Sequence, residues 1–86
     1  MRYIDIIRGN IDNHRARRGM TQQDLGAAVG ISRAAFSSKL HGHSSFDVGL
    51  LVRVAVALGV EFHELIEDIE QSDELAETQR KEAAAA

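Results

Sequence analysis

The residues of this chain best suited to bind another molecule through hydrogen bonds are Arg33, Ser37 and Ser38, which have small neighbours. A guanidinium can donate two hydrogen bonds to guanine O6 and N7, the commonest specific contact between a side chain and a base. Serine hydroxyls touch bases or phosphates but discriminate weakly, and Ala34 can meet a thymine methyl group. These residue types indicate nucleic-acid recognition with Arg33 as the main reader; a phosphate contact or a solvated surface arginine is the alternative for Arg33.

Catalysis and metal binding find little support in the sequence. His41 and His43 could hold a metal in a suitable loop, but no third ligand follows at a convincing spacing and the chain has no cysteine. His14 falls on the apolar side of its predicted helix, and His63 beside Glu64 does not make a site alone. The H-E-x-x-H and G-x-S-x-G motifs and a phosphate-cradling glycine loop are all missing. We expect no enzyme activity, no metal and no cofactor.

Two short helices must position these side chains. Thr21 can cap a helix that begins at Gln22, because its hydroxyl can accept an orphan amide hydrogen at the helix start. Gly30 can adopt the left-handed conformation that ends a helix, and Ser32 is the next cap. The spacing predicts a helix over Arg33–Leu40. The apolar residues that these two segments would bury are Leu25, Val29, Ile31, Phe36 and Leu40.

The pattern T-Q-x-x-L-x-x-x-x-G-I-S-x-x-x-F-S-x-x-L-x-G, residues 21–42, resembles the phage-repressor and Cro-like (XRE-type) helix-turn-helix family. Residues 50–60 are similar to the family's fourth helix and following turn, and Phe62 with Leu65 to its fifth helix. The resemblance covers residues 3–67. It implies an all-α, five-helix domain in which residues 33–40 form a recognition helix for the major groove of double-stranded DNA.

The chain departs from the family pattern at four places. Gly26 replaces the usual alanine, which should cost about 1 kcal/mol in a helix interior. Lys39 is charged near a packed position, and the loop after Gly42 lacks the common proline. Leu40 stands where the family often has a glutamate that pairs with an arginine at the Arg15 position, so we expect Arg15 to lack that partner.

Further contacts are expected to go to DNA phosphates. The resemblance places a phosphate contact at Gln22, and the free amides at that helix start favour an anion in any case. The arginines that end the first helix can instead compensate its dipole. The candidate base-reading residues are Arg33, Ala34, Ser37 and Ser38, and the candidate phosphate contacts are Arg17, Arg18, Thr21, Gln22, Gln23, Ser32, Lys39, His41, His43 and Ser44.

Charge is divided unevenly along the chain, although the net charge is −3. Residues 1–60 hold eight Lys or Arg against four Asp or Glu, a balance of +4, whereas residues 61–86 hold two against nine, a balance of −7. A basic surface is the usual footprint of nucleic-acid binding. The acidic part should therefore lie away from bound DNA or screen it.

The remaining segments complete one domain. We expect a first helix from Tyr3 to about Arg18, a fourth ending at Gly59 and a fifth from Glu61 to about Glu70, with Ser72 as a fresh cap. Residues 1–70 form the DNA-binding domain, and the acidic, alanine-rich residues 71–86 form a tail that is either helical or disordered. A dimer seam through Ile66, Ile69 and Leu75 is the other interpretation of this region.

The apolar side of the fourth helix is predicted to carry Val48, Leu51, Val52, Ala55 and Leu58.

The sequence as a whole predicts a DNA-binding transcriptional regulator, most simply a repressor, from a bacterium or phage. We expect a homodimer on an operator, with a monomer as the alternative, in the cytoplasm, with no membrane partner and no small-molecule effector. The rival function is a protein–protein interaction module, antitoxin-like or regulatory, that uses the acidic C-terminal third.

Overall fold

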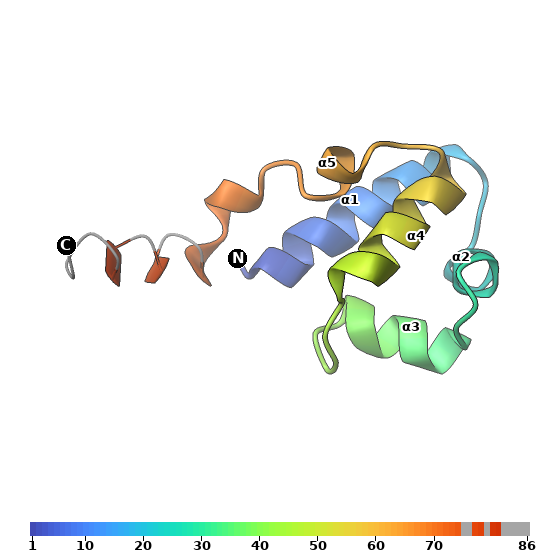
Figure 1. Ribbon diagram of the computed structural model, residues 1–86, viewed down its shortest axis with the longest axis horizontal. Helices are drawn as coiled ribbons and strands as arrows, with labels where there is room; N and C mark the ends of the chain where they lie inside the picture. Colours follow the sequence, from blue (N-terminus) through green and yellow to red (C-terminus); the bar gives the residue numbers. More distant parts are fainter. Residues whose placement is uncertain (75–76, 79, 82–86) are drawn as a thin grey trace.

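The computed structural model describes residues 1–74, 77–78 and 80–81. The described part is all α-helical apart from turns and loops, and it contains no strand (Figure 1). Its helices are α1 Tyr3–Arg17, α2 Gln22–Ala28, α3 Arg33–Leu40, α4 Val48–Leu58 and α5 Phe62–Leu65, followed by a 3₁₀ turn, η1, Ile69–Gln71. Within the same residues, no helix is long and apolar enough to cross a membrane.

The core forms where one face of each helix meets the others. In α1 the isoleucines at spacings of three and four are buried, which is the stripe that a helical repeat produces. α2 packs on α3 and α4, and α1 packs on α3 and α5. Phe36 and Leu40 of α3 are fully buried in this core, so the helix is anchored by its inner face. The buried apolar side chains are Ile4, Ile7, Ile11, Leu25, Val29, Phe36, Leu40, Leu50, Leu51, Val54, Ala55, Leu58 and Leu65.

Local signals set most helix ends as predicted. The side chains of Thr21, Ser32 and Asp47 each accept a hydrogen bond from the backbone amide three residues later. Gly59 ends α4 in the left-handed conformation, with φ 71°. The starts of α2 and α3 at Gln22 and Arg33 are confirmed, and α1 ends one residue earlier than expected.

The predicted fifth helix is wrong in length, because α5 stops at Leu65 instead of running to about Glu70. Asn10 on α1 donates hydrogen bonds from Nδ2 to the backbone oxygens of Leu65 (3.0 Å) and Glu67 (2.9 Å). Those carbonyls are thereby held outside a continuing helix. Asp68 then takes a left-handed conformation, with φ 67°, before the short η1 turn begins.

The predicted apolar face of α4 is also partly wrong. Val48 and Val52 are 67% and 44% exposed, and Val56 on the same side is 75% exposed. The buried face instead includes Leu50 and Val54. Each follows an exposed valine by two residues and therefore lies on nearly the opposite side of the helix. Nearly every residue of α4 is apolar, so its sequence alone does not show which side faces the core.

The C-terminal segment turns back to the start of the chain. The described residues 73–74, 77–78 and 80–81 are helical, and Ser72 before them is fully buried. Ile66 and Ile69 are partly buried against the domain's own core, which accounts for part of their apolar surface, and the dimer seam stays a prediction. Leu75, its third member, lies outside the described residues.

Gly26 lies where α2 approaches the turn into α3. A Cβ atom there would be 3.3 Å from the backbone oxygen of Ile31 and 3.6 Å from Cβ of Phe36. An alanine would gain helix propensity but would press on that turn. The glycine therefore permits a close approach between α2 and the segment that sets the start of α3.

Replacing Gly9 by alanine should stabilise the domain by roughly 0.5 to 1 kcal/mol, because Gly9 is exposed inside α1 and a Cβ there meets nothing within 4 Å. Gly19→Ala is the matched control: its Cβ is equally unobstructed, but φ is +66°, so this change should destabilise. Urea denaturation followed by circular dichroism measures both. Shifts of the same sign in the two variants would contradict the prediction.

Candidate nucleic-acid interface

The recognition-helix candidate, α3, is held at both ends and along its inner face. At its start, Oγ of Ser32 accepts a hydrogen bond from the amide of Ala35 (3.1 Å). At its end, Nη1 of Arg8 donates to the backbone oxygen of Leu40 (2.9 Å), while Nη2 pairs with Asp5. The side chain of Arg8 thus satisfies a carbonyl that a helix end leaves unpaired and fixes α3 against α1.

An aromatic contact connects the loop after α3 to the buried face of that helix. The rings of Phe36 and Phe46 meet edge to face, with centroids 6.0 Å apart and an interplanar angle of 83°. Pairs in this geometry stabilise by about 0.5 to 1.5 kcal/mol beyond the area they bury. The core residue of α3 therefore also positions the loop of residues 41–47.

The outer face of α3 carries the predicted base-reading residues. Arg33 and Ala34 are exposed, and Ser37 and Ser38 are half-buried beside them. Within the described part of the chain, the Arg33 guanidinium has no hydrogen-bond or ion-pair partner, and α3 contains no acidic residue. This side is thus a surface of small side chains with one extended cation near the start of the helix (Figure 1 shows α3 along one edge of the molecule).

The start of α2 is a closed capping box. Oγ1 of Thr21 accepts from the amide of Asp24 (3.0 Å), and Oδ2 of Asp24 accepts from the amide of Thr21 (3.0 Å). The hydrogen bonds from the backbone amide and hydroxyl of Thr21 hold the pKa of Asp24 below its usual value. Gln23 is exposed on the first turn.

Gln22 and Arg15 meet on Asp12 of α1. Nε2 of Gln22 lies 3.3 Å from Oδ1 of Asp12, and Nε of Arg15 lies 3.0 Å from the same oxygen. Nη1 of Arg15 also donates to the backbone oxygen of Met20 (2.9 Å). Arg15 therefore does have a carboxylate partner, Asp12, in place of the glutamate that Leu40 replaces, and it braces the turn between α1 and α2.

The loop after α3 is tied back to that helix by its own side chains. Nζ of Lys39 donates to the backbone oxygen of Ser45 (2.9 Å), and Oγ of Ser44 donates to Oγ of Ser38 (3.3 Å). Nδ1 of His41 lies 2.8 Å from the backbone oxygen of Ser37. His43 is exposed beyond these contacts. These bonds hold the loop residues that are predicted to contact DNA next to the end of α3.

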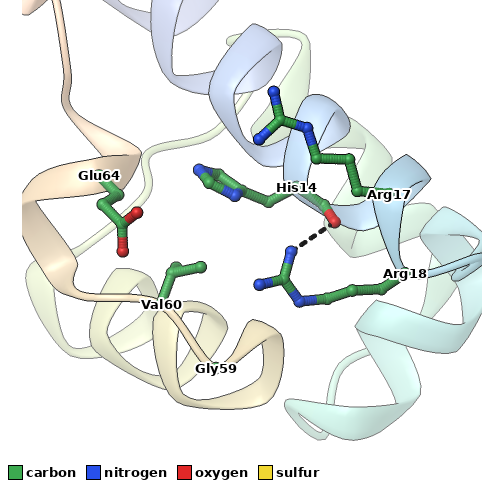
Figure 2. A pocket seen from close by; sticks show the side chains of 6 residues that line it. All are labelled: His14, Arg17, Arg18, Gly59, Val60 and Glu64. Atoms are coloured by element: carbon green, nitrogen blue, oxygen red, sulfur yellow. Dashed lines mark hydrogen bonds between the residues drawn. The ribbon is translucent and has the colours of Figure 1, made fainter.

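Arg17 and Arg18 lie elsewhere. With His14 they form one side of a hollow whose other side consists of Gly59 and Val60, in the turn after α4, and Glu64 of α5 (Figure 2). Nη1 of Arg18 donates to the backbone oxygen of His14 (2.8 Å) at the end of α1. The other candidate residues come from α2, α3 and the loop after α3, so the structure does not gather these two arginines into the same group.

Sequence reasoning missed Arg8 and Arg53 as positioning residues. Nη1 of Arg53 on α4 donates to the backbone oxygen of Val29 at the end of α2 (3.1 Å), much as Arg8 does at the end of α3. Asp5, three residues before Arg8, was a sequence signal for an ordered arginine there. Nothing in the sequence marks Arg53, whose partner is a backbone carbonyl 24 residues away.

The described residues hold no group of three His, Cys, Asp or Glu side chains placed to bind a metal ion. Comparison with known protein families matches residues 10–71 to the model for the Cro/C1-type HTH DNA-binding domain. No match was found among curated proteins or among solved structures. The matched segment contains α2, α3, α4, α5 and most of α1, so the helices just described are those of the family's fold. This chain therefore belongs to the Cro/C1-type helix-turn-helix DNA-binding domain family, which is typically non-catalytic.

Proposed function

We propose that this domain binds a specific operator in double-stranded DNA by inserting α3 into the major groove, and that it thereby represses transcription. The observation that carries the proposal is the outer face of α3, where Arg33 stands exposed and unpartnered within the described chain on a surface of small residues. Repressor-type domains direct the N-terminal end of this helix at base edges. Repression is the simplest outcome because a protein bound across a promoter obstructs the polymerase.

Contacts to the DNA backbone would come from both sides of α3. At one side, Gln22 and Gln23 stand at the start of α2, and their side-chain amides can donate hydrogen bonds to phosphate oxygens. At the other side, His41 and Ser44 are held against the end of α3, and His43 is exposed between them. Such contacts fix the register of the protein without reading sequence. Arg17 and Arg18 remain proposed phosphate contacts, although they lie outside this group at the end of α1.

Fluorescence anisotropy of labelled bulk duplex DNA, titrated with the full chain over a salt series, tests the proposal. Affinity should fall as salt rises, and each neutralised phosphate should make the slope of log affinity against log salt steeper by about 0.9. An affinity that does not change with salt would contradict DNA binding and favour the interaction-module function. Selection of bound sequences from a random pool then gives the operator and shows whether it is palindromic.

We also propose that the domain binds DNA as a homodimer through the outer face of α4. Val48, Val52 and Val56 form an exposed apolar stripe at a spacing of four residues. Beside it runs a groove between the end of α2 and α4, whose lining is mostly small and apolar but includes one arginine: Ala27, Ala28, Val29, Gly30, Val52, Arg53, Val56 and Ala57. A stripe on one helix is self-complementary across a two-fold axis, and a second copy of this chain is therefore the occupant that the stripe fits.

The change Val56→Glu should dissociate such a dimer, because it would place two carboxylates in an apolar interface near the two-fold axis. Gln71→Glu is the matched control, since it adds the same charge at an exposed position of η1, away from the proposed DNA contacts. We expect Val56→Glu to lower affinity for a palindromic operator at least tenfold while leaving a half-site unaffected. Sedimentation equilibrium gives the mass, and equal masses for Val56→Glu and the wild type would contradict this interface.

A further inference from the structure

The acidic C-terminal segment is fastened to the first two residues of the chain. The amide of Asp73 donates to the backbone oxygen of Met1 (2.9 Å), and the carboxylate of Asp73 pairs with the Met1 amine. Nε of Arg2 lies 2.9 Å from Oε1 of Glu74. Figure 1 shows that this segment begins beside the N-terminus and then leads away from it. The acidic residues at positions 73 and 74 are thus held against the domain.

Arg2 also lies against the loop that follows α3. A Cβ atom built on Gly42 would be 3.4 Å from Nη1 of Arg2, so the guanidinium lies beside Gly42. The neighbours of Gly42 on either side are His41 and His43, two of the proposed phosphate contacts. The side chain of Arg2 is 61% exposed, so it is accessible at the edge of this loop.

The carboxylate that holds Arg2 is incompletely satisfied. Oε1 of Glu74 accepts from Arg2, but Oε2 is buried and accepts no hydrogen bond within the described part of the chain. A buried acceptor without a partner loses the hydration it would have in water. If a competing anion took Arg2, release of Glu74 into solvent would restore that hydration. The ion pair is therefore one that a phosphate can displace.

We propose that Arg2 is a further phosphate-binding residue of the DNA interface, and that Glu74 competes with DNA for it. The inference rests on the proposed DNA-binding function. Arginine suits this role because its planar donors match phosphate oxygens as well as they match a carboxylate. In the free protein Glu74 occupies the guanidinium, and in the complex a backbone phosphate replaces it. The acidic segment thereby lowers affinity for all DNA sequences.

The test compares Glu74→Gln with Glu70→Gln on labelled bulk duplex DNA across a salt series. Both variants remove one negative charge from the same segment, but Glu70 is exposed and has no hydrogen-bond or ion-pair partner within the described residues. We expect Glu74→Gln to bind about threefold more tightly than Glu70→Gln at moderate salt, the order of one phosphate contact. Arg2→Ala should weaken binding and reduce the salt slope by about 0.9.

The double variant Arg2→Ala with Glu74→Gln separates competition from general repulsion. If Glu74 acts through Arg2, the gain from Glu74→Gln should vanish when Arg2 is absent, whereas Arg2→Lys should retain much of it. Equal affinities for Glu74→Gln and Glu70→Gln, in a protein that binds DNA, would overturn this inference alone. Failure of the wild type to bind bulk DNA at low salt would instead overturn the proposed function and this inference with it. Circular dichroism checks that each variant is folded.

Discussion

Replacing Arg33 by alanine is expected to relax sequence preference at one base pair of the operator while leaving the fold intact. A bidentate arginine–guanine pair discriminates by about 1 to 3 kcal/mol, so preference for that base should fall by roughly five- to 150-fold. Stability should not change, because Arg33 is exposed and makes no hydrogen bond or ion pair within the described residues. Competition binding against operators randomised at each position measures the loss.

Gln22→Ala provides the contrast for this experiment. Gln22 lies at the start of α2, where we propose a phosphate contact, so its loss should weaken all operators alike and leave the base preference unchanged. An Arg33→Ala protein that also lost affinity uniformly, with its preference intact, would show that Arg33 contacts the backbone. The reading of bases would then pass to Ser37, Ser38 and Ala34, whose discrimination is weak.

The helix-turn-helix segment could be predicted from sequence because local chemistry determines it. The caps at Thr21 and Ser32 are each satisfied by an amide three residues away, and that spacing is visible in the sequence. The glycines that end segments, such as Gly30 with φ 80° and Gly59 with φ 71°, act through their own backbone freedom. Caps and glycines of this kind act within a few residues along the chain, so they can be recognised before the fold is known.

The errors came from contacts between distant parts of the chain. α5 ends early because Asn10 takes the carbonyls of Leu65 and Glu67, at sequence separations of 55 and 57 residues. The apolar sequence of α4 does not determine which side faces the core, and the prediction that Val48 and Val52 do so is wrong. The spacing of apolar residues within either segment does not indicate which distant residues it will contact.

Part of the basic charge of residues 1–60 serves the fold. Arg8, Arg15 and Arg53 each donate to the backbone carbonyl at the end of a helix or turn, and they thereby brace the packing of α1, α2 and α3. Their charge still contributes to the electrostatic potential around the domain, but their guanidinium groups are engaged in hydrogen bonds within the fold. Arg33 is different, because it has no hydrogen-bond or ion-pair partner within the described chain, and this difference could not be read from a count of charges.

Phe36→Ala should cause the largest loss of stability among these changes. The Phe36 side chain is fully buried between the helices and packs edge to face on Phe46. Truncating such a residue costs about 3 to 5 kcal/mol, from the lost burial and the cavity left behind. A small domain has only about 5 to 15 kcal/mol in total, so a large fraction of the protein should unfold at modest temperature. Urea denaturation followed by circular dichroism gives the change in free energy.

Phe36→Leu is the matched control, because leucine refills most of the cavity and keeps the inner face of α3 apolar. It should lose much less stability than the alanine variant and should retain DNA binding. The two variants also separate anchoring from readout, since neither alters the outer face that carries Arg33. If Phe36→Ala lost less than about 1 kcal/mol, α3 would have to be held by its ends, through Ser32 and Arg8, and burial of its inner face would not be what positions the recognition helix.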